Sequence, residues 1–474
     1  MPIQEVLIVT SIVAGTAIEA LSANILDTRF EDFDRITVKN AKNRIIDVIG
    51  CAIGGANAPG NQALVDLVKE WGGKKEATIL VHGGRAPAHN VAMVNAIMCR
   101  SFDFEVMSVL VEGRQYAAHH AATMVMTALA LGEAKGISGQ ELITAMIAGD
   151  DITARIIAAS DIDLGLGWDG TGTYTAFGAA AIAGRLLGLN KREMRNAFGI
   201  VLNNVASTVQ GIWDGATTFK YGQGSAAMNG IMAAQLAKKG WKGPDDALLS
   251  RYGFYALYTH GCKNPAILTE NLGKKYYAES VFKPYPCCRA THSTIDAALA
   301  LAKGHDIKTD DITEATISVP ARLLDSFVAK PFQVREYPHC DAIFSLRYTC
   351  ATALLRKCVQ QEYFTPEAIN DSKVNKLISK IRLAALKETA PRAIEVRVKM
   401  SDGREFSGSA ATGKGDPLDS PLSDAEIITK YLSQVEFSKT VSRVNAEKLL
   451  ESLERLEKID NLAKIVALAV KKSI

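Results

Sequence analysis

The segment AFGAAAIAGRLLG at residues 176–188 is the most informative part of this sequence for predicting the architecture. Alanine and glycine occupy both faces of a helix drawn through it, so neighbouring helices can approach closely on either side. A helix of this kind is expected at the centre of a helical body. The same small residues account for much of the 48% hydrophobic content without a membrane segment.

Working outward from this helix, apolar residues recur at helical spacing over most of residues 40 to 260. Glycines or polar clusters separate the successive helices. The predicted helices cover 40–54, 88–102, 121–135, 139–159, 174–187, 191–210 and 225–239.

The pattern changes after Gly261. Residues 315–322 and 395–409 alternate like strands, and Asp402-Gly403 is typical of a hairpin turn. Two helices are predicted in the same region, one at 291–303 before the first strand and one at 344–357 between the two strand segments. Helical spacing returns after Gly415, notably in 445–468. The chain is therefore predicted to be mainly α. An all-helical main domain would be built from both chain ends, 1–270 and 411–474, with a smaller α+β lid domain at 271–410 inserted between them.

Composition excludes several classes of protein. The 54 Lys and Arg nearly balance the 51 Asp and Glu, and no basic stripe occurs, so a nucleic-acid partner is not expected. The apolar run 6–25 has no preceding Lys or Arg and is interrupted by Glu19, which favours a core-facing first helix over a signal or membrane span. Eight scattered cysteines fit a reducing cytoplasm better than a disulfide scaffold.

Two titratable residues mark the ends of neighbouring predicted helices. Asp103 in RSFDFE (100–105) closes one helix, and His119 in AAHHAAT (117–123) opens the next. A carboxylate beside an imidazole at a cleft could abstract a proton next to a carboxylate-activated carbon. The alternative is a capping Asp and a surface His. The neighbouring His120 must point elsewhere on a helix.

The segment GLGWDGTGTY (165–174) precedes the central helix. It lacks the G-x-x-x-x-G-K-[ST] pattern and no strand comes before it, so a nucleotide-binding loop is disfavoured. It is either a flexible loop in which Thr173 caps the following helix, or a carboxylate-binding site at the N-terminus of that helix, to which Thr171 would contribute.

The segment KPYPCCRATH (283–292) concentrates positive charge. Lys283, Arg289 and His292 suit a ligand with more than one carboxylate. Cys287 and Cys288 are adjacent, which is poor geometry for a shared tetrahedral metal, and no other metal-ligand spacing occurs, so no metal is expected. A Cys nucleophile acting with His292 stays an alternative.

Several blocks together resemble the MmgE/PrpD family over nearly the whole chain. The matching blocks are FEDF to AKNRIIDVIGCAIGGA (30–56), GTGTYTAFGAAAIAGRLLGL (170–189), GSAAMNGIMAAQLAKKGWKGPDDALLSRYGF (224–254), KPYPCCRATHSTIDAAL (283–299), DAIFSLRYTCATAL (341–354) and GKGDPLDSPLSDAEI (413–427).

The resemblance implies an all-helical domain with a smaller α+β lid domain, assembled as a homodimer. Members of the family include 2-methylcitrate dehydratase, cis-aconitate decarboxylase and iminodisuccinate epimerase. Their common chemistry is proton handling beside a carboxylate without a metal or organic cofactor, so no cofactor is expected here.

Residue by residue, Asp103 and Glu105 match the first two acids of the family's D-F-D-D segment, and His119 matches the histidine that opens the family's next helix. Lys220 is the nearest match to the active-site lysine, with a slip of one residue, and Arg289 and His292 match directly. Three positions depart from the pattern: Asp169 replaces a histidine, Val106 an acid and Met107 a threonine.

The expected function is that of a cofactor-free, dehydratase-type lyase acting on a small di- or tricarboxylate. In this reading His119, with Asp103 beside it, moves the α-proton, and His292 or Asp169 protonates the leaving group. Arg289, Lys220 and Lys283 hold carboxylates. A decarboxylase, an epimerase and a non-catalytic carboxylate-binding protein are the alternatives.

Overall fold

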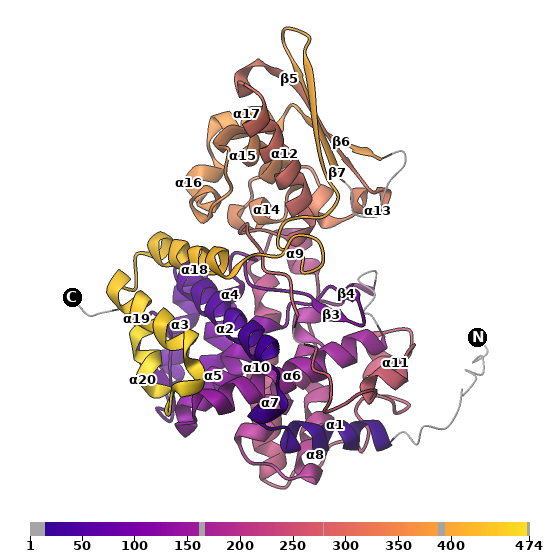
Figure 1. Cartoon of the computed structure of the whole chain (residues 1–474), viewed down its shortest axis with the longest axis vertical. Helices are drawn as coiled ribbons and strands as arrows, with labels where there is room; N and C mark the ends of the chain where they lie inside the picture. The colour runs from indigo at the N-terminus through magenta and orange to yellow at the C-terminus, as the bar shows by residue number, and fades with distance from the viewer. Residues whose placement is uncertain (1–14, 161–165, 278, 387–393, 472–474) are drawn as a thin grey trace.

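The computed structural model describes residues 15–160, 166–277, 279–386 and 394–471. The protein is mainly helical, with one small mixed sheet in its C-terminal region. Figure 1 shows two stacked units: a larger helical body below, and a smaller upper unit that carries the sheet.

The helix predicted to be central is α7 (Thr175–Leu186), and every residue from its start to Gly184 is buried. It packs against α5 (Ala121–Lys135), α6 (Gly139–Ala159), α8 (Lys191–Val201) and α10 (Tyr221–Lys238). A Cβ on Gly178 would overlap Thr153 Oγ1, and one on Gly230 would lie 2.5 Å from Ala179 Cβ. Small residues are therefore required where these helices meet, as the composition indicated.

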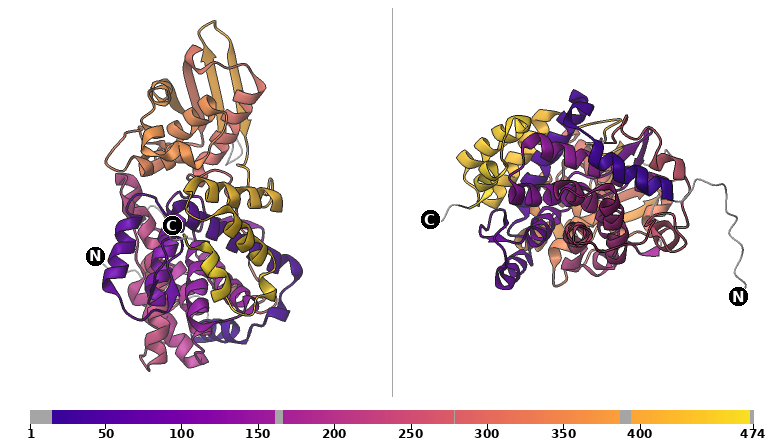
Figure 2. Two further views of the ribbon diagram at one scale, coloured as in Figure 1. Left: turned by 90° about the vertical axis from the view of Figure 1, so that its left-hand side faces the viewer. Right: turned by 90° about the horizontal axis from the view of Figure 1, so that it is seen from below.

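Both chain ends contribute to the helical body. The N-terminal half supplies α1 (Gly15–Asp27), α2 (Arg35–Gly55), α3 (Asn61–Trp71) and α4 (Ala88–Arg100). The C-terminal helices α18 (Asp424–Ser438) and α19 (Arg443–Glu454) pack against α2, and α20 (Ala463–Val466) packs against α5 (Figure 2). Of the apolar run 6–25, residues 15–25 lie in α1, and the remainder is outside the described residues. Among the described helices, none is long and apolar enough to cross a membrane.

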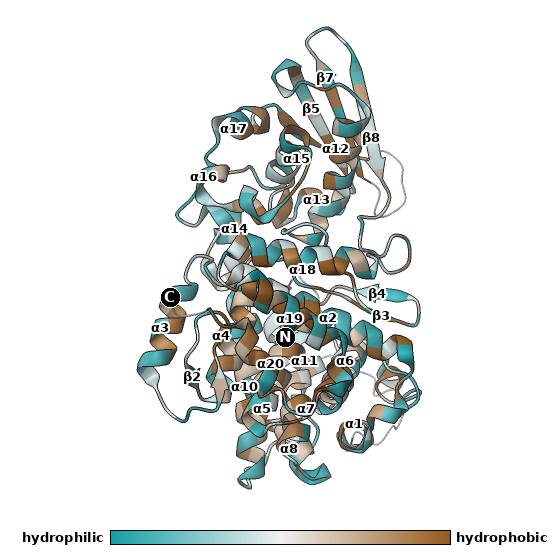
Figure 3. Cartoon of the chain, turned by 60° about the vertical axis from the view of Figure 1, so that its left-hand side comes forward, coloured by the Kyte–Doolittle hydropathy of each residue, from teal (hydrophilic) through white to brown (hydrophobic). Residues whose placement is uncertain are grey.

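The upper unit surrounds a four-stranded sheet of order β6-β5-β7-β8. Strand β5 (Ile312–Val319) runs parallel to β6 (Ile381–Ala385) and antiparallel to β7 (Ile394–Met400), which pairs with β8 (Glu405–Ala410). The hairpin turn contains Gly403 at φ +87°, as Asp402-Gly403 predicted. The unit's helices are α12 (His292–Gly304), α13 (Ala321–Leu324), α14 (Pro338–Ile343), α15 (Leu346–Arg356), α16 (Pro366–Ile369) and α17 (Ser372–Ile378), with α12 covering the sheet (Figure 3).

Some expectations need correction. The body is not purely helical, because it holds two short antiparallel hairpins, β1 (Ala77–Thr78) with β2 (Arg85–Ala86) and β3 (Val109–Val111) with β4 (Arg114–Tyr116).

The helix predicted over 191–210 is also wrong beyond Val201, where a 3-10 turn (Leu202–Asn204) follows, and the short α9 (Gln210–Asp214) begins only at the last predicted residue. The amide of Ala206 donates to Gly172 O, and Asp169 N donates to Ser207 O. Pairing with the loop before α7 therefore replaces the helical hydrogen bonds.

The chain passes from the body to the upper unit near 282–288 and returns near 413–416 (Figure 1). These two crossings touch, since a Cβ on Gly415 would overlap Phe282 O. Gly415 has φ +92°, so this close approach needs glycine for both space and backbone conformation.

Candidate active site

The loop that follows α4 carries two fully buried carboxylates. Helix α4 ends at Arg100, and Asp103 N donates to Arg100 O at 2.9 Å to close a turn. Asp103 has φ +48°, an uncommon value for a residue other than glycine. Both Asp103 and Glu105 have an exposed fraction of 0%. This segment, residues 101–107, is called the acidic loop below.

Two buried cations balance these two carboxylates. Arg100 Nη1 forms ion pairs with Asp103 Oδ1 and, at 3.3 Å, with Glu105 Oε1. Lys283 Nζ donates to Asp103 O at 2.5 Å and to Asp103 Oδ1 at 2.8 Å. Lys283 therefore reaches the acidic loop from the crossing between the units, where the sequence had suggested a carboxylate-binding role.

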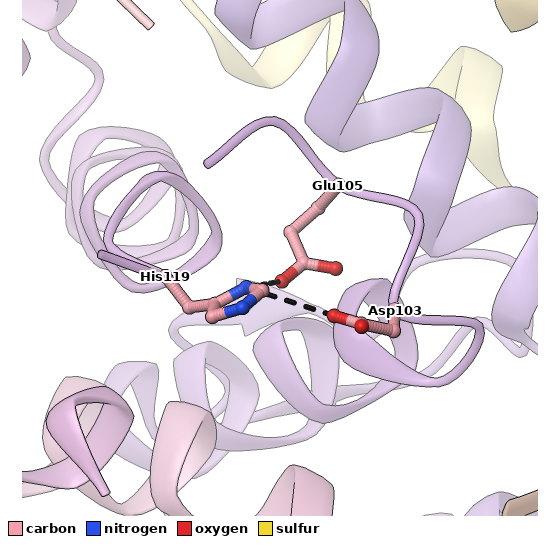
Figure 4. A group of neighbouring side chains, drawn as sticks. All are labelled: Asp103, Glu105 and His119. Atoms are coloured by element: carbon pink, nitrogen blue, oxygen red, sulfur yellow. Dashed lines mark hydrogen bonds and ion pairs between the residues drawn. The ribbon is translucent and has the colours of Figure 1, made fainter. Parts of the chain in front are cut away.

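His119 joins this cluster from the start of α5 (Figure 4). Its Nδ1 lies 2.8 Å from Glu105 Oε1 and 3.7 Å from Asp103 Oδ1. Its carbonyl accepts a hydrogen bond of 3.0 Å from Gln223 Nε2 on α10. The predicted pairing of Asp103 with His119 is thus present, but Glu105 is the nearer partner.

The charges around His119 set its protonation state. Burial, with repulsion from Arg100 and Lys283, lowers the pKa of His119 to about 3. Burial alone would raise the pKa of Glu105, but Arg100 and the hydrogen bond from His119 lower it to about 2. At neutral pH Glu105 is ionised and His119 is neutral, with Nδ1–H donating to Glu105 and a lone pair left on Nε2. The His119 side chain is 20% exposed, whereas both carboxylates are buried, so a ligand would meet His119 first.

Asp103, Glu105 and His119 also form the one group of three potential metal ligands found among the described residues, with ligand atoms within 4.8 Å of one another. The donor set does not fit a divalent metal well, because Arg100 and Lys283 already neutralise both carboxylates. A metal ion would add two positive charges beside two resident cations.

Lys220 lies on the other side of the acidic loop. Its Nζ contacts three neutral oxygens: Pro59 O at 2.6 Å, Asn61 Oδ1 at 2.7 Å and Ser101 Oγ at 3.4 Å. Burial lowers the pKa of Lys220 to about 7. An ammonium held only by neutral oxygens is suited to an incoming anion.

The loop before α7 contributes Asp169 and Thr171. Asp169 Oδ1 accepts from Thr171 N at 2.9 Å, and burial raises the pKa of Asp169 against the lowering effect of Arg100. Thr171 Oγ1 is buried and has no hydrogen-bond partner among the described residues. It lies 2.7 Å from the position of a Cβ on Gly222, so this loop faces the N-terminal end of α10 beside Lys220.

Arg289 and His292 lie elsewhere. Arg289 donates to the carbonyls of Gly413 and, at 2.5 Å, Lys414, and its Nη1 is 3.3 Å from His292 Nδ1. His292 is fully buried, with Nε2 3.2 Å from Cys287 O. These contacts tie the two crossings together, and the structure does not bring either side chain into contact with Asp103, Glu105 or His119.

The Cys–His alternative finds no support in the geometry. Cys287 Sγ lies 3.3 Å from Thr291 Oγ1, and His292 contacts the carbonyl of Cys287, not its sulfur. Burial raises the pKa of Cys287 to about 12, so the thiol stays protonated at neutral pH.

Three members of the cluster were not foreseen as site residues: Arg100, Glu105 and Gln223. Arg100 stands three residues before Asp103, a spacing that suggests an ion pair at a helix end, and Glu105 was noted only as a family match. No local signal marks Gln223, because its contact with His119 spans 104 residues.

A cleft of about 950 Å³ separates α18 from the upper unit. Phe104 of the acidic loop, Tyr285 of the crossing and Lys430 of α18 form part of its wall. Of the acidic loop, Phe104 is the residue that lines this cleft.

These features define a two-unit helical protein with a buried carboxylate–imidazole centre near the junction of its units. The chain belongs to the MmgE/PrpD family: residues 19–265 match the MmgE/PrpD N-terminal domain, and residues 285–456 match the MmgE/PrpD C-terminal domain.

Two relatives are similar along almost their full length. The chain is 24% identical to the cis-aconitate decarboxylase of Aspergillus terreus over 469 residues, which cover 93% of this chain and 94% of the relative. It is 22% identical to the cis-aconitate decarboxylase-like protein oryM of Aspergillus oryzae over 466 residues, 92% of each.

Proposed function

We propose that this protein is a lyase of the dehydratase type that acts on a small di- or tricarboxylate by abstracting an α-proton with its own side chains. The observation that carries the proposal is the state of His119. Its Nδ1–H is held by ionised Glu105 at 2.8 Å, so Nε2 keeps a lone pair, and the His119 side chain, 20% exposed, is the most exposed of the cluster formed with Arg100, Asp103, Glu105 and Lys283. A carboxylate that fixes the tautomer of a neutral imidazole is a general-base arrangement.

The substrate's carboxylates would be held by cationic and hydrogen-bonding groups around this base. Lys220 offers an ammonium bound only by neutral oxygens, and Thr171 offers a hydroxyl without a partner among the described residues. A bound carboxylate raises the pKa of both Lys220 and His119, since negative charge favours their protonated forms. Binding thereby strengthens His119 as a base, and Lys220 stabilises the negative charge that develops when the α-proton leaves.

We assign the role of general acid, which protonates the leaving hydroxyl, to Asp169 and not to His292. Burial raises its pKa, which favours a proton on this carboxyl. His292 contacts Arg289 and Cys287 O through its two ring nitrogens. In the proposed elimination, the α-proton goes to His119 Nε2, the carbon–oxygen bond breaks, and the leaving hydroxyl takes the Asp169 proton to depart as water.

Decarboxylation is the second candidate, because one relative is named as a cis-aconitate decarboxylase and the other as a cis-aconitate decarboxylase-like protein. In that reaction the carbon–carbon bond breaks first, carbon dioxide leaves, and a protonated group delivers the proton to the resulting carbanion. Asp169 in place of histidine, with apolar Val106 and Met107 in the acidic loop, favours a different substrate or outcome from that of these relatives.

The deciding experiment follows cis-aconitate, citrate and a panel of 2-hydroxy dicarboxylates by proton NMR in deuterated water, with carbon dioxide release measured in parallel. The proposal expects deuterium incorporation at the α-carbon and loss or gain of water, both abolished by His119→Ala. The matched control is His305→Ala, which removes an exposed histidine of the upper unit.

Each other outcome points to one alternative. Carbon dioxide release without hydration favours the decarboxylase, and exchange with inversion but no elimination favours an epimerase. Equal rates for wild type and His119→Ala remove His119 from the mechanism, and tight binding without exchange identifies a carboxylate-binding protein.

Two structural proposals accompany this function. The α+β unit predicted at 271–410, which the chain enters near 282–288, acts as a lid over the acidic loop, and the protein assembles as a homodimer. Light scattering coupled to size-exclusion chromatography tests the dimer. Hydrogen exchange at 282–288 and 413–416, with and without cis-aconitate, tests the lid.

A further inference from the structure

Two buried residues outside the cluster hold the backbone on both sides of Glu105. Lys430 Nζ, on α18, donates to Phe104 O at 2.7 Å, and Asp47 Oδ1, on α2, accepts from Val106 N at 2.9 Å. Lys430 and Asp47 also form an ion pair of 2.5 Å with each other. The residue before Glu105 and the residue after it are thus bound by one ion pair.

This pair is almost completely removed from water. The exposed fractions of the Lys430 and Asp47 side chains are 5% and 0%. The Lys430 ammonium also lies 4.0 Å from the centroid of the Phe104 ring, a cation–π contact with the same loop residue. A buried ion pair is often no more stabilising than an apolar pair of similar volume, because both charges lose their hydration. An apolar pair, however, can neither donate to Phe104 O nor accept from Val106 N.

The acidic loop needs such an external restraint. Its residue Asp103 has φ +48°, and Ser108 just beyond it has φ +63°, so the local backbone is held in conformations that these residues rarely adopt. The contact that depends on this loop is the 2.8 Å hydrogen bond between Glu105 Oε1 and His119 Nδ1. A displacement of about 1 Å at Glu105 would break that bond and free the imidazole to change tautomer.

We propose that Asp47 and Lys430 are positioning residues that hold Glu105 in place and, through Glu105, fix the orientation and tautomer of His119. The expected change in kcat rests on the proposed function, whereas the expected change in the tautomer of His119 does not. It also gives the C-terminal helix α18 a role in the chemistry of a site built mainly by the N-terminal half. Asp47 and Lys430 stand 383 positions apart (430 minus 47), so only the fold brings them together.

The test compares Lys430→Met, Asp47→Leu and the double variant with Lys42→Met. Lys42 is the matched control because it also joins α2 to the C-terminal segment, through Glu454 O at 2.7 Å and Glu457 Oε2 at 2.9 Å, but away from the acidic loop. Turnover of cis-aconitate, or of whichever panel acid the wild type uses, gives kcat and KM. We expect kcat to fall about 10- to 100-fold in the single variants with KM within about threefold. Lys42→Met should stay within about twofold of wild type.

The double variant separates positioning from stability. Replacing both partners with apolar residues removes the unpaired buried charge left by either single change, so melting temperature should recover relative to the single variants. Because Phe104 O and Val106 N still lack their partners, kcat should stay low. Lys430→Arg, whose guanidinium can donate both to Asp47 and to Phe104 O, should restore most of the activity.

A measurement without substrate makes the inference independent of the proposed function. Isotope labelling of the histidine rings, with His119 assigned by the signal lost in His119→Gln, reports its tautomer by NMR. The charged groups facing this ring are Glu105, Asp103, Arg100 and Lys283. Wild type and Lys42→Met should show one Nδ1–H tautomer from pH 5 to 8, and Lys430→Met a mixture of tautomers.

An unchanged His119 signal in both Lys430→Met and Asp47→Leu would overturn the positioning role, whatever the activity. Recovery of kcat together with melting temperature in the double variant would also overturn it, because the pair would then act through stability alone. If the wild type turns over no carboxylate while the His119 signal shifts as expected, the proposed function fails and the positioning role stands.

Discussion

Replacing Glu105 with glutamine tests the general-base arrangement most directly. Glu105 Oε1 accepts from His119 Nδ1 at 2.8 Å and lies 3.3 Å from Arg100 Nη1, and Arg100 can only donate hydrogen bonds. Both contacts are to the same oxygen, so in Glu105→Gln the amide oxygen can take the place of Oε1 and accept from Arg100 and from His119 Nδ1–H, which keeps the tautomer of His119. The new NH₂ group then takes the place of Oε2, which has no hydrogen-bond partner among the described residues. What the variant loses is the negative charge that stabilises the imidazolium formed when Nε2 takes the α-proton.

The expected loss follows from the missing charge. A positioned general base contributes about 10²- to 10⁴-fold to kcat, and a base of lower pKa takes the α-proton less readily. Since His119 keeps its tautomer and a second carboxylate, Asp103, at 3.7 Å, we expect kcat to fall about 10²-fold, or about 2.7 kcal/mol of transition-state stabilisation. KM should change by less than about threefold, because Glu105 is buried and holds no substrate.

The assay measures kcat and KM on the best acid of the panel between pH 6 and 9. Loss of the Glu105 charge lowers the pKa of His119 further, so the imidazole is neutral throughout and higher pH should restore nothing. Glu112→Gln is the matched control, since Glu112 is an exposed glutamate on the neighbouring β3–β4 turn, bound to Lys275 and Tyr277. Activity of Glu105→Gln within about fivefold of wild type, or its recovery at pH 9, would refute the role of the Glu105 charge in supporting His119 as the base.

Three further predictions concern single positions. Burial lowers the pKa of Lys220 from its ordinary value of 10.5 to about 7. Between pH 7 and 10 the unfolded chain therefore binds more protons than the folded protein, so the free energy of unfolding should rise with pH over this range. Melting curves of wild type and Lys220→Met should therefore diverge with pH, and parallel curves would contradict the lowered pKa. Asp169→Asn should reduce elimination at least about 100-fold while leaving α-proton exchange intact, and an equal loss of both would show that Asp169 is not the acid. Gly415→Ala should lower the free energy of unfolding by about 2–4 kcal/mol, because it combines a positive φ with a clash against Phe282 O. Gly403→Ala, with a similar φ and open space around it, should cost only about 1 kcal/mol, and equal costs would argue against the contact between the crossings.

Local patterns in the sequence predicted most of the helices well. The bounds of α5 and α6 agree with the predicted 121–135 and 139–159, because their apolar periodicity and flanking residues act over only a few positions. Strand β6 was not predicted, because its sequence IRLAA continues the helical pattern before it. It forms a strand by pairing with β5, and the helices α13 to α17 lie between these two strands in the chain.

The candidate site was predicted in part. Asp103 and His119 do meet, and Lys283 does point into the cluster. Arg289 and His292 were grouped with Lys283 because they share one short stretch of sequence, but the start of α12 turns them towards the carbonyls of 413–414 and 287. Residues that are close in the sequence need not contribute to the same site when a turn lies between them.

Local patterns in the chain were enough to predict the helical architecture around 176–188, the family blocks and the titratable residues that could form a site. Three features came from long-range contacts: Glu105 is the direct partner of His119, Arg100 and Lys283 neutralise the cluster, and Asp47 and Lys430 hold its backbone. The two kinds of feature differ in the distance along the chain over which they act. Helical periodicity and turn chemistry act between neighbours in the chain, whereas burial, charge pairing and pKa depend on which distant side chains the packed core brings within a few ångströms.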